Sequence, residues 1–307
     1  MSAADRMAHA DRLGGAAGAA GPTGGSAGPA SSRRPARLGA RLLASEVGMV
    51  LRRRRNQLML LVLVAIPVII GVAVKLTTDP ESGGPTGLIG NITNNGIFVS
   101  FTALVVVIPV FLPMAVSVVV GESIAGEASS GTLRYLLAVP VSRTRLLLVK
   151  FAAAAIWCLV IAAAVAAAGL VIGFALFPAG RVTLLSGTQT SLAGGIGRLA
   201  LVVCYAALMM LAIAAIGLFI STLTEVPVAA MAAVLAVAVG MQVLVAVPQL
   251  QALRPWLISN YLLGFSDVLR DPLSLAGLRR GVLLALGYIA LFWLLAWARF
   301  SNKDISS

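Results

Sequence analysis

Two short stretches carry residue types that could do chemistry. The first, residues 24–28, has the pattern G-x-S-x-G, whose serine is a nucleophile on a strand-turn-helix elbow with a histidine nearby. The only histidine, His9, and this pattern both lie in sequence rich in Ala, Gly, Ser and Pro, which builds no such elbow. Cys158 and Cys204 each fall inside an apolar run, which indicates neither a disulfide framework nor a metal site. The sequence therefore predicts no catalytic residue and no metal ligand.

The second stretch, residues 121–150, gathers charged side chains in a chain of which only 11% of the residues are charged. Its acids and cations are Glu122, Glu127, Arg134, Arg143, Arg145 and Lys150. As ordinary membrane-edge residues, they would do no more than extend their charges to the lipid headgroups. As a docking surface, they would set the register of a bound protein.

Composition places this stretch in a membrane protein. Of the 307 residues, 59% are hydrophobic and the mean hydropathy is +0.99, whereas a soluble chain needs about 25% charged residues to cover its surface. The net charge of +12 does not indicate a nucleic-acid partner, because aromatic residues are few and the basic residues lie beside apolar runs.

Six apolar runs approach the length of about 20 residues that spans a bilayer as a helix. They are residues 57–76, 97–120, 147–177, 199–223, 227–247 and 282–298. The third is too long for one span and is expected to continue beyond the bilayer. If both termini are cytoplasmic, sixteen of the twenty-three Lys and Arg residues lie inside, as the positive-inside rule requires. We therefore expect an all-α, multi-pass protein of the cell membrane with six transmembrane helices.

The sequence before the first span divides into two parts. Residues 1–36 are too poor in large apolar side chains to form a core and are predicted to be disordered. Residues 37–55 place polar and apolar residues on separate helical stripes, which predicts an amphipathic interfacial helix. Its final run, Arg52, Arg53, Arg54 and Arg55, is predicted to anchor the chain on anionic lipid, and Lys150 to do so at the third span.

The centres of the predicted spans contain no ionisable residue, which disfavours a membrane enzyme or an ion-coupled carrier. Pro109 and Pro113 lie one turn apart in the second span and predict a hinge there. Gly169 and Gly173 form a GxxxG step that would allow close approach of another helix. The most polar residues inside the predicted spans are Gln242, Thr102 and Ser117, and the best interpretation of each is a hydrogen bond between helices.

Residues 121–146 are predicted to form the cytoplasmic loop between the second and third spans. Ser129, Ser130 and Gly131 predict a break, after which residues 132–139 can form a short helix stopped by Pro140.

The order of residues in this loop resembles the cytoplasmic loop of ABC transporter permeases of the type-two exporter family. The residues that carry the resemblance are Glu127, Gly131, Thr132, Leu133, Leu136, Leu137, Pro140, Val141, Ser142, Arg143 and Lys150. Six spans and an amphipathic N-terminal helix extend the resemblance over residues 37–307. The loop departs from the family pattern at two positions, Ser129 in place of a second acid and Val149 in place of glycine.

The resemblance implies that residues 56–307 are a permease domain whose loop docks onto a separate ATP-binding subunit. The implied coupling residues are Glu122, Glu127, Gly131, Thr132, Leu133, Arg134, Leu136, Leu137, Pro140 and Arg143. The chain has no phosphate-binding loop, so ATP and Mg²⁺ are expected in the partner, and no cofactor in this chain. A half-transporter of six spans implies a second permease copy, as a homodimer. The expected function is export of an amphipathic or hydrophobic molecule, such as a drug, an antibiotic or a lipid. The alternative is a membrane assembly or immunity subunit that binds a partner without transport.

Overall fold

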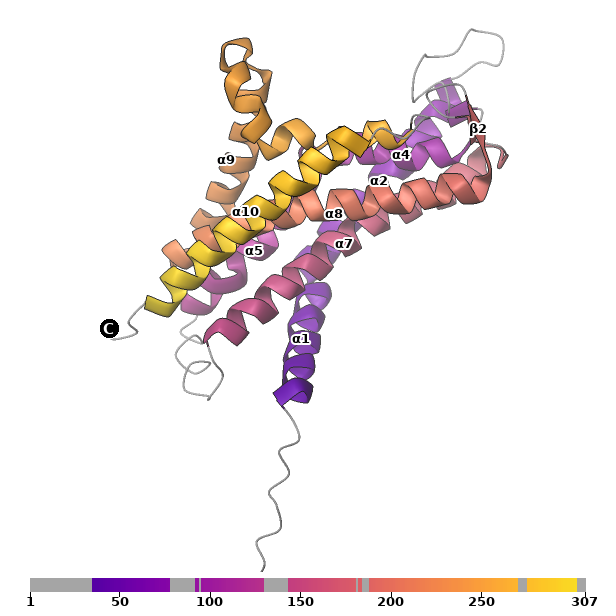
Figure 1. Ribbon diagram of the computed structural model, residues 1–307. Helices are drawn as coiled ribbons and strands as arrows, with labels where there is room; N and C mark the ends of the chain where they lie inside the picture. Colours follow the sequence, from indigo (N-terminus) through magenta and orange to yellow (C-terminus); the bar gives the residue numbers. More distant parts are fainter. Residues whose placement is uncertain are drawn as a thin grey trace, which may run out of the picture. The chain divides into compact units, whose positions relative to one another are not determined.

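The computed structural model describes residues 35–77, 92–93, 95–129, 143–180, 182–183, 188–269 and 275–302. Its α-helices are α1 Pro35–Arg52, α2 Arg54–Thr77, α4 Ile97–Val107, α5 Phe111–Ser129, α7 Arg143–Leu176, α8 Leu192–Leu223, α9 Pro227–Ala246 and α10 Leu275–Asn302 (Figure 1). Three 3₁₀ helices, η2 Pro248–Trp256, η3 Ile258–Tyr261 and η4 Gly264–Leu269, connect α9 to α10. One antiparallel pair of two-residue strands, β1 Val182–Thr183 and β2 Gln189–Thr190, precedes α8.

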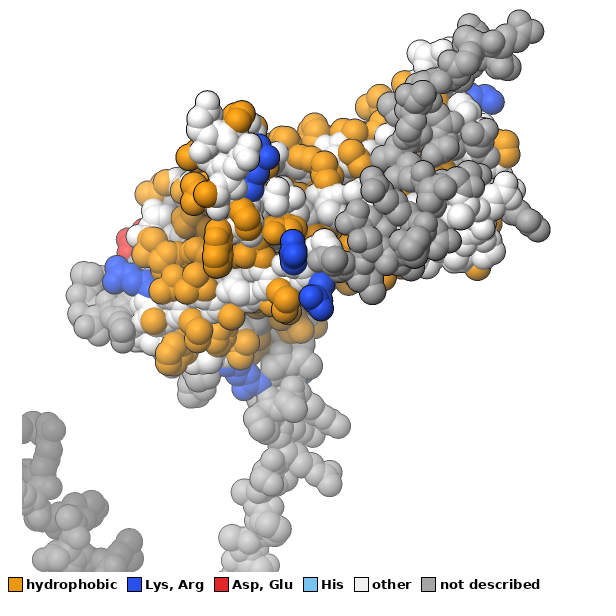
Figure 2. Space-filling model, turned by 45° about the horizontal axis from the view of Figure 1, so that its top comes forward, with side chains coloured by type: hydrophobic (Ala, Val, Ile, Leu, Met, Phe, Trp, Pro, Cys, Tyr) orange, Lys and Arg blue, Asp and Glu red, His pale blue; other side chains and the backbone are white. Residues whose placement is uncertain are grey.

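Six of the described helices are long and apolar enough to cross a membrane, which confirms the all-α, multi-pass prediction. They are α2, α5, α7, α8, α9 and α10. Helix α8 is central, because α5, α7, α9 and α10 all pack against it. The outer surfaces of the spans keep large hydrophobic side chains exposed, as helices in contact with lipid require, and Figure 2 shows them spread over one face.

The second predicted span, residues 97–120, is two helices rather than one kinked helix. Residues 108–110 form a turn between α4 and α5, because Pro109 has no N–H with which to continue the helical ladder. Pro113 lies in the first turn of α5, where a missing N–H costs nothing. The Gln242 amide of α9 donates to the carbonyl of Pro109, which confirms the predicted bond between helices for this residue. The same prediction is wrong for the other two, because the Ser117 hydroxyl donates to the carbonyl of Met114 in its own helix and the buried Thr102 hydroxyl has no partner among the described residues.

The loop predicted over residues 121–146 is shorter than expected. Residues 121–129 are the last turns of α5, and residues 143–146 are the first turn of α7. Helix α5 continues because Ile124 and Ala125, which are 4% and 0% exposed, remain buried by neighbouring helices. The predicted short helix at 132–139 lies outside the described residues.

The N-terminal segment differs from its prediction in where its helices end and begin. Helix α1 ends at Arg52 and α2 begins at Arg54, so the arginine run spans a break instead of ending one helix. The Asn56 side chain, 2% exposed, donates to the carbonyl of Val50 at 2.8 Å and satisfies one free carbonyl at the end of α1. The disordered tail predicted for residues 1–36 falls outside the described residues except for its last two, which begin α1.

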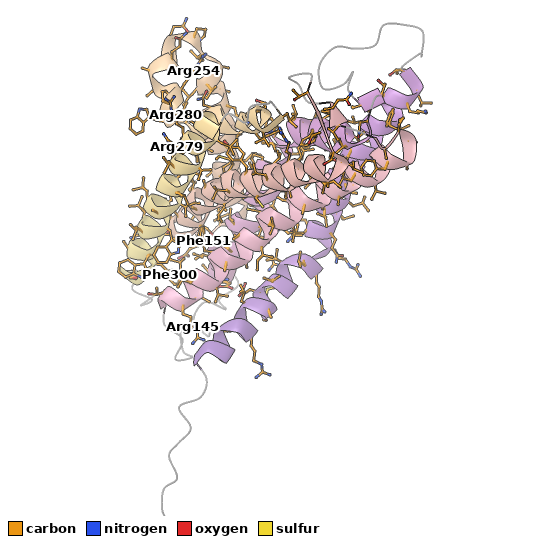
Figure 3. All side chains as sticks on the ribbon, turned by 45° about the vertical axis from the view of Figure 1, so that its right-hand side comes forward. Arg145, Phe151, Arg254, Arg279, Arg280 and Phe300 are labelled. Carbon is orange, nitrogen blue, oxygen red and sulfur yellow. The ribbon has the colours of Figure 1, made fainter. Side chains whose placement is uncertain are left out.

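The third predicted span is one continuous helix of 34 residues, as the length of its apolar run indicated. At 1.5 Å per residue α7 measures roughly 50 Å, well beyond the hydrocarbon thickness of about 30 Å. Figure 3 places Arg145, near the start of α7, at one end of the bundle and Arg254, Arg279 and Arg280 at the other.

Candidate functional site

The residues predicted to couple the chain to a partner fall into two groups. Glu122 and Glu127 lie on the last turns of α5, and Arg143 is the first residue of α7. The remaining seven, Gly131, Thr132, Leu133, Arg134, Leu136, Leu137 and Pro140, lie outside the described residues. The structure therefore defines the two ends of the docking segment and the charged side chains that lie there.

One end is held by arginines from the joint between α1 and α2. Arg55 donates to both carboxylate oxygens of Glu122, each at 2.6 Å, and Arg53 donates to the same carboxylate. The side chain of Arg53 is 49% exposed, that of Arg55 is 44% exposed, and that of Glu122 is 20% exposed. A two-pronged arginine–carboxylate pair fixes orientation as well as distance. This pairing ties the start of α2 to the end of α5.

This pairing changes the interpretation of the arginine run. The anchor prediction assigned all four side chains to lipid headgroups, but Arg53 and Arg55 bind a carboxylate of the same chain. Arg52 and Arg54 are exposed and remain suited to the membrane surface. The sequence signal for the pair was the complementary acid Glu122, 67 residues after Arg55.

The other end is held by a buried lysine. Lys150 of α7 is 5% exposed, and its ammonium contacts the carboxylate of Glu127 on α5 and, at 3.6 Å, that of Glu46 on α1. A lysine so enclosed does not extend to lipid headgroups, which differs from its predicted role as a membrane anchor. The contact between α5 and α7 bridges 23 residues of sequence and closes the neck of the predicted docking segment.

Together these groups form one charged cluster, which we call the neck cluster: Glu46, Arg53, Arg55, Glu122, Glu127 and Lys150. Its three acids and three bases balance only over the whole cluster, because Glu122 faces two arginines whereas Lys150 is shared by Glu46 and Glu127. Helices α1, α2, α5 and α7 all contribute to it. Sequence reasoning missed Glu46, whose only signal was that it is the single acidic residue of α1. The ion pairs of the neck cluster therefore join α1, α2, α5 and α7 beside the predicted docking segment.

Buried hydrogen bonds also hold α5 in place at the neck cluster. The Ser221 hydroxyl of α8 is fully buried, donates to the carbonyl of Gly121 and accepts from the N–H groups of Ile124 and Ala125, all at 3.0–3.1 Å. A Cβ at Gly121 would lie 2.7 Å from the backbone nitrogen of Met231 on α9, so this turn of α5 is pressed against α9 as well.

We predict that Ser221→Ala lowers the free energy of unfolding by about 1–3 kcal/mol, because one buried carbonyl and two N–H groups lose their shared partner. Titration of the purified protein with SDS in mixed micelles measures the change. Ser123→Ala is the matched control on α5, since the Ser123 hydroxyl bonds only to the carbonyl of Val120 in its own helix. Equal effects of the two substitutions would refute a special role for Ser221.

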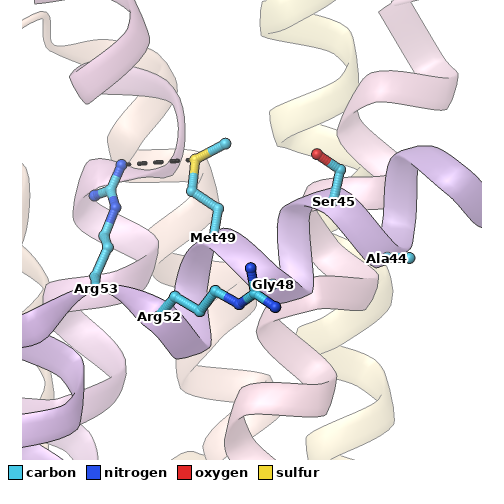
Figure 4. A pocket seen from close by; sticks show the side chains of 6 residues that line it. All are labelled: Ala44, Ser45, Gly48, Met49, Arg52 and Arg53. Carbon is cyan, nitrogen blue, oxygen red and sulfur yellow. Dashed lines mark hydrogen bonds between the residues drawn. The ribbon is translucent and has the colours of Figure 1, made fainter.

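An open depression of about 570 Å³ lies on α1 beside the neck cluster (Figure 4). It is lined by Ala44, Ser45, Gly48, Met49, Arg52 and Arg53. Arg53 reaches back over it to the Met49 sulfur, 3.9 Å away. Among the described residues, its lining brings no nucleophile and base together.

A model of a protein family matches most of the chain. Residues 85–306, more than two thirds of the chain, match the model of a family described as "Protein of unknown function (DUF2705)". The match includes five of the six candidate spans, among them α5 and α7 of the neck cluster. No curated protein matches the chain.

Proposed function

The chain belongs to the DUF2705 family, whose function is unknown. From the resemblance of residues 127–150 to the cytoplasmic loop of type-two exporters, we propose that the chain is the membrane-spanning permease subunit of an ATP-driven ABC exporter in the cell membrane. The cargo would be an amphipathic or hydrophobic molecule moved outward. A separate ABC ATP-binding subunit would supply ATP hydrolysis, with its ATP and Mg²⁺, and a second permease copy would complete the pathway as a homodimer.

The observation that carries the proposal is the pairing of Lys150 with Glu127. This pair brackets residues 130–142, the segment whose sequence resembles the docking loop of type-two exporters. A loop can transmit force only if its two ends are fixed to the helices that precede and follow it. The neck cluster meets that requirement on both sides, through α5 and α7.

The proposed stroke follows from the same contacts. Closure of the ATP-binding subunits pushes the docking segment, and the neck cluster passes this displacement to α5. The turn at residues 108–110 lets α5 tilt against α4, because Pro109 has no N–H to donate to the carbonyl of Val105. The Gln242 bond to Pro109 would then join the tilt to α9.

A co-purification experiment tests the proposal. The solubilised full chain is isolated together with the products of its neighbouring genes, as wild type, as Arg134→Glu, and as Arg279→Gln. Arg134 lies in the docking segment, whereas Arg279 is an exposed arginine at the opposite end of the bundle (Figure 3). We expect an ATPase to co-purify with wild type and Arg279→Gln, and at least about tenfold less of it with Arg134→Glu, since charge reversal in a docking patch costs several kcal/mol.

Two results would refute the proposal. One is the absence of any ATPase from wild-type samples in which the chain remains folded, which would favour an assembly or immunity subunit. The other is an ATPase bound equally by all three forms, which would place the docking surface elsewhere.

A further inference from the structure

A half-enclosed apolar groove lies between α2 and α5. Its volume is about 220 Å³, and almost all of its exposed lining is carbon. Leu63 and Ala115, only 3% and 2% exposed, form the floor, and Leu58, Val62 and Met114 form an open rim. The groove therefore opens outward from the bundle, on the surface that the apolar spans present to lipid.

One end of the groove is cationic. Arg55 supplies the positive charge at that end. Phe111, the first residue of α5, is also part of the lining. Along α2, Arg55 and Leu63 are eight residues apart, which is about 12 Å of helix. A ligand of this shape would have a charged head and an apolar tail about 12 Å long.

The charge at the head end fits an anion. Arg55 is 44% exposed and uses two of its five N–H donors on Glu122, which leaves three for a ligand. Arg52, Arg53 and Arg54 precede it directly, so the run carries four positive charges against the single negative charge of Glu122. The planar fork of arginine donors matches the oxygens of a phosphate.

We propose that this groove binds an anionic phospholipid of the leaflet that α1 faces, with one acyl chain along Leu58, Val62 and Met114 and the phosphate at Arg55. The occupant is a lipid because the groove opens from two membrane spans and an apolar cavity of this kind does not hold ordered water. It is anionic because basic clusters beside a span attract negative headgroups by about 1 kcal/mol per arginine. This site is independent of the transport function proposed above.

Photolabelling tests the site. The full chain is reconstituted into phosphatidylcholine nanodiscs that contain a small fraction of either phosphatidylglycerol or phosphatidylcholine with a diazirine in one acyl chain. After illumination, the labelled residues are mapped by mass spectrometry. We expect labelling at Leu58, Val62 or Met114, stronger with the phosphatidylglycerol probe. The double substitution Arg52→Gln with Arg54→Gln, which leaves the Glu122 pairs intact, should reduce that labelling about fivefold per arginine.

A substitution that fills the groove provides a second test of the site. Val62→Trp places a ring over the groove at a position that is 52% exposed, and it should remove labelling at Leu58 and Met114 without unfolding the chain. Val72→Trp is the matched control, because Val72 is an exposed residue of the same helix outside the groove. Equal labelling by the two probes would overturn the anionic specificity, and labelling unaffected by Val62→Trp would overturn the site itself.

Discussion

Lys150→Met is expected to lower the free energy of unfolding by about 3–5 kcal/mol, the cost of removing one partner from a buried ion pair. The ammonium is 4% exposed and is the shared partner of Glu127 and Glu46. Without it, two carboxylates from α5 and α1 face each other with a methionine between them. SDS titration in mixed micelles, followed by tryptophan fluorescence, measures the loss.

Two further variants separate charge from packing. Lys75→Met is the matched control, because Lys75 is exposed near the other end of α2 and forms only a cation–π contact with Phe177. It should change the unfolding free energy by less than about 1 kcal/mol. The double substitution Lys150→Met with Glu127→Leu should recover most of the stability, since an apolar pair can replace a buried ion pair at little cost. If Lys150→Met resembled Lys75→Met, the buried role of Lys150 would be wrong.

The spans could be predicted because their signal is local. A run of about twenty apolar residues has few stable solutions in lipid, and five of the six predicted runs coincide with single candidate spans, while the run 97–120 overlaps only the first half of α5. The break at Pro109 was half predicted, as a kink. Whether a proline kinks or ends a helix depends on what satisfies the freed backbone groups, and here the Gln242 side chain of α9, 133 residues away, contacts the Pro109 carbonyl.

The partners in the neck cluster could not be predicted, because they are chosen by tertiary packing. The positive-inside rule counts arginines by their position along the chain and is blind to an acid such as Glu122 that folds against them. Lys150 was read as a membrane-edge residue for the same reason. Its burial depends on α1, whose Glu46 lies on the side that faces α7. Sequence periodicity identifies such a face, but it does not say which helix covers it.

The contact between α4 and α7 was predicted in part. The glycines of α7 that allow it were identified from the sequence, but the helix that packs against them was not. The GxxxG step at Gly169 and Gly173 faces the start of α4. A Cβ at Gly169 would lie 2.6 Å from the Cα of Ser100, and one at Gly173 would overlap the carbonyl oxygen of Gly96. The Ser100 hydroxyl donates to the carbonyl of Ala166 at 2.9 Å and fixes the register. The predicted close approach is confirmed.

Gly173→Leu is therefore expected to lower the free energy of unfolding by about 3 kcal/mol or more, at the upper end of the cost of overpacking. The atoms in the way are backbone atoms of Gly96, which cannot move aside as a flexible side chain would. Helix α4 would have to separate from α7, and Asn95, whose side chain donates to the carbonyl of Gly180 at 2.9 Å, would lose that bond. SDS titration reports the stability.

Gly287→Leu is the matched control, because Gly287 lies inside α10 with open space where its Cβ would be. Leucine also has the higher helix propensity, by about 1 kcal/mol, so the control should be neutral or slightly stabilising. The opposite signs of the two substitutions distinguish a helix contact from a general effect of adding leucine to a span. A Gly173→Leu chain as stable as the control would show that α4 and α7 do not approach as closely as these backbone contacts require.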